Sequence, residues 1–180
     1  MSKVVLTFGL IAGAIVAALM WLSQPLMANG TISFENGMLV GYATMIIALS
    51  LVFVGVKSYR DNHNNGVLSF GKGFQVGIFI ALVASFIYAV SWEAYLTTLD
   101  GDFMEQYSAQ YIEQMEANGA SDEEVEEMKV EMTSMSEMYK NPLIRFAMTL
   151  MEIVPVGLLI TLISAFILKQ NEPPRMREAA

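Results

Sequence analysis

One carboxylate, Glu152, lies inside an otherwise apolar segment of this chain. Counted inward from Leu143 at about 1.5 Å per residue, it lies roughly 13 Å deep in a helix, near the middle of a bilayer. An ionisable group at that depth is costly, so it is a functional candidate by default. Pro155 cannot donate a hydrogen bond to the carbonyl of Met151, and Gly157 loosens the helix further, which predicts a kink. A carboxylate beside a freed carbonyl could bind a proton or a small cation.

A structural role for Glu152 is the favoured interpretation, because no other polar group shares its depth. In that role the residue is protonated and hydrogen-bonded to a neighbouring helix. Glu93 is a second candidate for an ion or proton site, and Arg145 lies at a similar depth on a neighbouring apolar segment. The sequence leaves two arrangements open: Glu93 and Arg145 form an ion pair, or each side chain extends separately to the membrane interface.

A series of three methionines, Met132, Met135 and Met138, offers thioethers that could bind Cu(I). On a helix, however, Met138 lies about 120° from Met132, so an apolar packing stripe is favoured and no metal site is predicted. The chain has no cysteine and one histidine, which excludes disulfides, thiolate chemistry and multi-histidine sites. We expect no cofactor and no enzymatic activity.

Four long apolar segments position these residues, at 4–22, 38–56, 74–96 and 143–168. Each reaches the roughly 18–20 residues that a helix needs to cross a bilayer. Lipid offers no partner to open backbone groups, so such segments must be helical. The sequence therefore predicts an all-α fold, a four-transmembrane-helix bundle that forms one membrane domain, with the lipid bilayer as its main partner.

The segment 100–140 differs sharply in charge from the rest of the chain. It holds twelve acidic and two basic side chains, a net charge of −10, whereas the whole chain carries −8. Asp102 with Glu105, and Ser121 with Glu124, have the spacing of capping boxes and mark two helix starts. Both predicted helices carry an apolar stripe, which predicts an amphipathic αα-hairpin between the third and fourth spans. Nucleic acid is excluded as a partner because it would repel this segment.

Basic residues set the predicted orientation, because cytoplasmic loops are enriched in Lys and Arg. Seven of them fall on one side of the predicted spans: Lys3, Lys57, Arg60, Lys72, Lys169, Arg175 and Arg177. We therefore expect both termini to be cytoplasmic and the acidic hairpin to be extracytoplasmic. Residues 170–180 contain two prolines and no apolar run, and a disordered tail is expected there.

Pairs of glycines four residues apart recur in three spans and allow close approach of helix backbones. They are Gly9 with Gly13, Gly37 with Gly41, and Gly73 with Gly77. Packing within the bundle is the favoured interpretation, and a homodimer face is the alternative.

With these features laid out, the chain resembles a bacterial membrane family known as domain of unknown function 4199. The resemblance lies in Leu68-Ser69-Phe70-Gly71-Lys72-Gly73-Phe74, in the stretch from Tyr88 to Tyr95, in the acidic hairpin, and in Asn141-Pro142. It implies four spans and a bacterial inner membrane, and it supplies no reaction and no site residues.

Two functions are compatible with these sequence features. The leading expectation is a non-enzymatic protein that assembles with itself or binds another membrane protein. The alternative is a small transporter or channel that couples to protons or cations at Glu152.

Overall fold

The computed structural model describes residues 1–170, and these are helical almost throughout. The helices are α1 (Ser2–Ala28), α2 (Phe34–Leu49), α3 (Leu51–His63), α4 (Phe70–Leu96), α5 (Phe103–Ala117), α6 (Asp122–Tyr139) and α7 (Pro142–Leu168). Within the described residues the one β-type pairing is an isolated bridge between Leu68 and Gln170. The predicted all-α class is confirmed. Of the disordered tail expected at 170–180, Gln170 is ordered by the bridge to Leu68, and residues 171–180 lie outside the described residues.

Within residues 1–170, four helices are long and apolar enough to span a membrane: Ser2–Ala28, Asn36–His63, Phe70–Leu96 and Pro142–Leu168. The second of these combines α2 and α3, which meet at Ser50. All four are longer than the apolar segments from which they were predicted. Helical hydrogen bonding continues through polar residues until a cap ends it, whereas hydropathy reports only the part that suits lipid.

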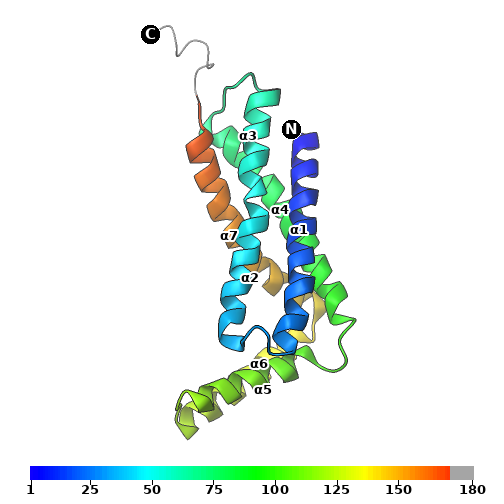
Figure 1. The fold of residues 1–180 in the computed structure, drawn as a ribbon, viewed down its shortest axis with the longest axis vertical. Coiled ribbons are helices and arrows are strands. Elements are labelled where there is room, and N and C mark those ends of the chain that lie inside the picture. Colours follow the sequence, from blue (N-terminus) through cyan, green and yellow to red (C-terminus); the bar gives the residue numbers. More distant parts are fainter. Residues whose placement is uncertain (171–180) are drawn as a thin grey trace.

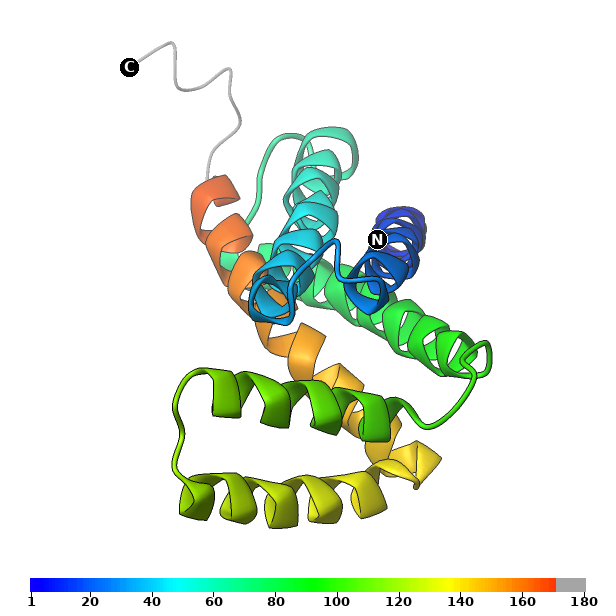
Figure 2. The same ribbon diagram turned by 60° about the horizontal axis from the view of Figure 1, so that its bottom comes forward.

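The long helices run side by side, and α5 and α6 run across one end of the bundle (Figure 1). We call this the α5–α6 end. The N-terminus, the turn from α3 to α4 and the end of α7 lie together at the opposite end. Figure 2 shows α5 and α6 lying side by side and antiparallel, joined by a short turn. In that turn Gly119 has φ +83°, a conformation that favours glycine.

Short polar side chains cap several of the helices at their starts, among them α5, α6 and α7. The Asp102 carboxylate accepts hydrogen bonds from the first turn of α5, and Ser121 forms a reciprocal capping box with Glu124 at the start of α6. Asn141 accepts a hydrogen bond from the backbone N–H of Leu143 at 3.0 Å. These caps satisfy N–H groups that have no partner inside the helix.

The seam between α4 and α7 is built from small residues four positions apart. A β-carbon added to Gly77 would lie 2.8 Å from Cγ2 of Thr161, and one added to Gly157 would lie 2.9 Å from Cβ of Ala81. The same antiparallel register brings a β-carbon at Gly73 within 3.3 Å of the backbone of Ala165. Close approach of this kind gives helices dispersion contact where lipid provides no hydrophobic drive.

The predicted glycine pairs differ in what they contact. Gly9 and Gly13 pack against Val83 and Ile87 of α4, at 2.7 and 2.6 Å from an added β-carbon. A β-carbon at Gly37 would meet only the flexible end of Met27. An added β-carbon at Gly41 would meet no neighbouring element of the described chain within 4 Å, so no close helix approach is formed at this position. The alternative left open by the sequence, a contact with a second copy, stays a prediction.

Pro155 lies inside α7, which continues as one helix on both sides of it. Proline lacks the N–H that would bond to Met151, so that carbonyl loses its helical partner. The side chain of Met151 is 76% exposed and points away from the bundle. Gly157, predicted to loosen the helix, instead provides the contact surface for Ala81.

Candidate functional site

A cavity of about 410 Å³ lies at the α5–α6 end, between the ends of α1, α4 and α7 and the facing side of α5. We call it the Glu152 cavity. Its lining residues are Gln24, Met27, Ala28, Tyr88, Trp92, Tyr95, Leu99, Phe103, Gln106, Tyr107, Gln110, Tyr139, Met148, Thr149 and Glu152. The volume is within the range of roughly 300–1,000 Å³ typical of small-molecule sites.

Glu152 provides the one charged side chain among the described residues that line this cavity. The Glu152 side chain is exposed and lines the cavity. The preceding side chain, Met151, does not line it. No hydrogen bond or ion pair to Glu152 is formed by the residues that the structure describes. The expected hydrogen bond from Glu152 to a neighbouring helix is therefore absent from the described chain. The carboxylate instead faces a space large enough for a ligand.

Aromatic rings from three helices form much of the wall. Tyr88, Trp92 and Tyr95 follow one face of α4, and each is at most 9% exposed. Phe103 of α5 meets Trp92 edge-on, with ring centroids 5.0 Å apart. Phe103 and Tyr107 stack at 6.0 Å. The wall is thus built by ring contacts between α4 and α5 and within α5.

Tyr88, Tyr107 and Tyr139 line the cavity together with the Glu152 carboxylate. Burial raises the pKa of Tyr107 above its usual value, and burial raises the pKa of Tyr139 to about 12. Both side chains therefore stay neutral around pH 7, and Glu152 is the group that decides the charge of the cavity.

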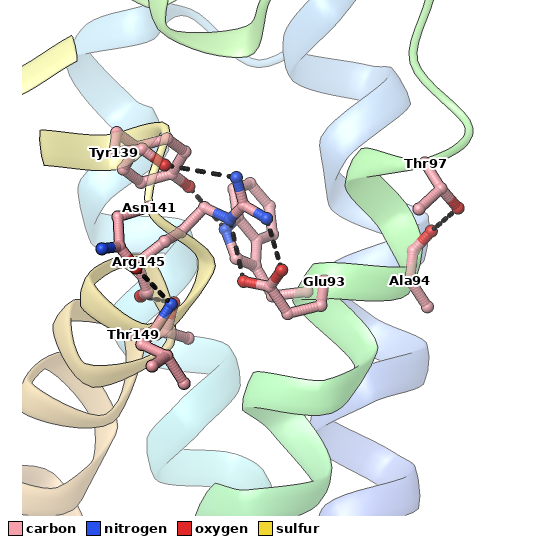
Figure 3. A network of polar contacts seen from close by, with 9 residues as sticks. Glu93, Ala94, Thr97, Tyr139, Asn141, Arg145 and Thr149 are labelled. Carbon is pink, nitrogen blue, oxygen red and sulfur yellow. Dashed lines mark hydrogen bonds and ion pairs between the residues drawn. The ribbon is translucent and has the colours of Figure 1, made fainter. Parts of the chain in front are cut away.

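A polar network beside the cavity holds α4, α6 and α7 together (Figure 3). Arg145 donates hydrogen bonds to both carboxylate oxygens of Glu93, at 2.8 and 2.5 Å. It also donates to the backbone carbonyl of Tyr139 at 3.2 Å. The ion pair is therefore the arrangement that forms, of the two that the sequence left open. Glu93 is neutralised by Arg145 and does not line the cavity with Glu152.

The indole of Trp92 donates a hydrogen bond to the hydroxyl of Tyr139 at 2.6 Å. This contact links the middle of the aromatic wall to the end of α6. Because Arg145 binds the backbone of the same tyrosine, Tyr139 is held from both sides. The network thus positions the α5–α6 pair over the end of the bundle.

The three methionines do not share one face of α6. Met132 is buried, Met135 is half-buried, and Met138 is 47% exposed. The described residues also contain no group of three or more His, Cys, Asp or Glu side chains that could hold a metal ion.

Sequence reasoning identified Glu152 but missed the rest of the cavity. The spacing of Tyr88, Trp92, Tyr95 and Leu99 places these residues on one helical face, a pattern that could have indicated a shared surface. Phe103 and Tyr107 show the same four-residue spacing on α5. That these two faces meet depends on how α5 folds back over the bundle.

Comparison with known proteins gives one match. A family described as "Protein of unknown function (DUF4199)" matches residues 7–170. No curated protein and no solved structure matches the chain. Because the family match covers most of the sequence, the chain belongs to the DUF4199 family.

Proposed function

We propose that this protein is a small transporter that takes up a cationic solute or a proton at Glu152. The observation that carries the proposal is the Glu152 cavity, in which one unpaired carboxylate faces a space of about 410 Å³. Transport at Glu152 was the alternative function left open by the sequence. The cavity favours it over a purely structural role for Glu152.

The charge of the cavity supports a cationic ligand. An ionised carboxylate within a membrane-spanning helix is costly unless a proton or a positive charge compensates it. Arg145, the nearest basic residue in α7, is engaged with Glu93 and Tyr139. The compensating charge must then come from the ligand or from a bound proton.

The packing of α4 and α7 supports a site with access from one end. Towards the opposite end of the bundle these helices approach closely at Gly73, Gly77 and Gly157. The cavity lies beyond this small-residue seam, next to α5. Transport across the membrane then requires the seam to open while the α5–α6 end closes, as alternating access demands.

For the orientation we propose a bacterial inner membrane with the α5–α6 end outside. The supporting observation is that α1 begins, α3 joins α4 and α7 ends at the same end of the bundle (Figure 1). Lys3, Lys57, Lys72 and Lys169 belong to these segments. Enrichment of basic residues at one end is typical of the cytoplasmic side.

Flux through proteoliposomes tests the transport proposal. Glu152→Gln should abolish proton- or cation-coupled flux, because it removes the charge and keeps the shape. The matched control is Glu137→Gln, which removes a carboxylate that forms an exposed pair with Lys140 and does not line the cavity. Equal flux in Glu152→Gln and the parent would contradict the proposal.

A second candidate is the assembly function that the sequence favoured. Its specific support is Gly41 on α2, where an added β-carbon would meet no neighbouring element within 4 Å and where apolar side chains such as Leu39 and Ile46 are exposed. A second copy or another membrane helix could approach there. Gly41→Leu should then dissociate a complex that the parent forms in mild detergent, and a monomeric parent would contradict this candidate.

A further inference from the structure

We infer that the Glu152 cavity binds a small organic cation, with an alkylammonium group held between the Glu152 carboxylate and the aromatic wall. This inference rests on the proposed function and specifies the ligand class of the same site. It follows from three properties of the cavity: the sign of its charge, the kind of side chains that surround that charge, and its size.

The sign of the charge favours a cation. No Lys, Arg or His is among the described residues that line the cavity, and Glu152 is its single ionisable acid. An anionic ligand would meet a carboxylate with no compensating base. A cation would instead gain a counter-ion in surroundings where charge interactions are weakly screened.

The surrounding side chains favour an organic cation over a metal ion. Hard metal cations need several oxygen ligands, and Ca²⁺ takes about six to eight. Among the described residues the cavity offers one carboxylate, and no cluster of three metal-binding side chains exists elsewhere. What it offers in quantity is aromatic surface, whose π faces attract ammonium groups and whose area also covers alkyl groups.

The aromatic wall is suited to this role because its rings are fixed before a ligand binds. Tyr88, Trp92 and Tyr95 are buried on α4, and Trp92 is further held by its hydrogen bond to Tyr139. Tyr107 approaches the same space from α5. Preorganised rings cost little entropy on binding, and aromatic cages recognise quaternary ammonium groups in this way.

The size of the cavity indicates more than a bare ammonium ion. At about 410 Å³ it exceeds the space that a single small ion fills. Gln24, Gln106 and Gln110 also line it and offer amide groups for hydrogen bonds. A ligand that carries both an alkylammonium group and a polar group fits this lining.

The test compares choline with 3,3-dimethylbutan-1-ol, which has the same shape without the charge. Both are titrated calorimetrically into the full-length protein in nanodiscs of zwitterionic lipid. Choline should bind at least tenfold more tightly than the neutral compound, because cation–π and carboxylate contacts both require the charge. Equal affinities, or no binding of choline at millimolar concentration, would overturn the inference.

Two variants assign the effect to the site. Glu152→Gln should reduce choline affinity about tenfold and leave the neutral compound unchanged. Tyr107→Leu, on α5 outside the spans, should weaken choline several-fold through loss of one ring. The controls are Glu137→Gln and Tyr42→Leu, which change an exposed carboxylate and an exposed ring that do not line the cavity. Equal losses in variants and controls would contradict the assignment.

The outcomes separate this inference from the proposed function. Charge-selective choline binding that depends on Glu152, without any flux in proteoliposomes, would leave the ligand class standing and contradict transport. Proton flux that depends on Glu152, without selectivity for choline over its neutral analogue, would support transport and contradict the ligand class.

Discussion

The guanidinium of Arg145 and the carboxylate of Glu93 form a two-point contact that joins α7 to α4 at the α5–α6 end of the bundle. The pair continues the register set by Gly77 with Thr161 and by Ala81 with Gly157. One antiparallel seam thus changes from close packing of small residues at one end to an ion pair at the other. The Glu152 cavity opens beside the part of the seam held by the ion pair.

Removing one partner of this pair should destabilise the fold. The side chains of Arg145 and Glu93 are 19% and 26% exposed, so the pair lies between exposed and fully buried cases. Glu93→Gln should therefore cost about 2 kcal/mol, between the roughly 0–1 of exposed pairs and the 3–5 of buried ones. Reversible unfolding in mixed micelles measures the difference.

The Lys140–Glu137 pair is the matched control, because both side chains are well exposed, at 59% and 67%. Glu137→Gln should leave the unfolding midpoint unchanged. A destabilisation as large as that of Glu93→Gln would mean that the position of the Arg145 pair in the seam does not matter.

Gly77 and Gly41 provide a second matched comparison. Gly77→Ala places a methyl group 2.8 Å from Cγ2 of Thr161, which should destabilise the protein by about 1–3 kcal/mol through overpacking. Gly41→Ala meets no described atom within 4 Å and should have little effect on the isolated chain. Combining Gly77→Ala with Thr161→Ser, which removes the clashing methyl group, should recover much of the loss. A neutral Gly77→Ala would contradict the packing described for the seam.

The proposed orientation can be tested with single cysteines, because the chain has none of its own. Ala117→Cys lies at the end of α5, and Asn62→Cys lies near the end of α3. A membrane-impermeant maleimide added to intact bacterial cells should label Ala117→Cys, and should label Asn62→Cys only after lysis. The reverse pattern would overturn the orientation with both termini inside.

Tyr139 should show a distinct titration at high pH. Burial raises its pKa from 10 to about 12, so the folded protein retains a proton that the unfolded chain loses between these values. The resulting stabilisation is complete below about pH 10 and is lost as pH rises through about 12. Tyrosinate absorbance should therefore show that Tyr139→Phe has one late-titrating phenol fewer than the parent. A parent without this late phenol would contradict the burial of Tyr139.

Local features of the sequence predicted much of the fold. The four apolar segments, and the caps at Asp102 and Ser121, follow from hydropathy and short-range hydrogen bonding, and the structure contains them all. The interruption at Ser50 and the extension of α1 through Pro25 were not predicted. Both depend on how a helix end is accommodated by its neighbours, which the local pattern does not encode.

The site could be predicted only in part, for the same reason. Glu152 was found because a carboxylate in an apolar segment is conspicuous whatever surrounds it. Its surroundings depend on contacts between α4 and α5, such as Trp92 with Phe103, which are set by the path of the chain after α4. That Gly41 has no neighbouring helix close to it could not be predicted, because glycine spacing does not tell which face of a helix meets a neighbour.

The central claim is that Glu152 faces a water-accessible cavity at the α5–α6 end and does not face lipid. The most direct measurement is the reactivity of Glu152→Cys towards a cationic methanethiosulfonate reagent, compared with Met151→Cys next to it. We expect Glu152→Cys to react from the α5–α6 side and to be protected by choline, while Met151→Cys, which does not line the cavity and is 76% exposed on the outside of the bundle, stays unreactive. If the membrane shielded both cysteines and neither reacted with the reagent, the cavity-facing position of Glu152 would be contradicted.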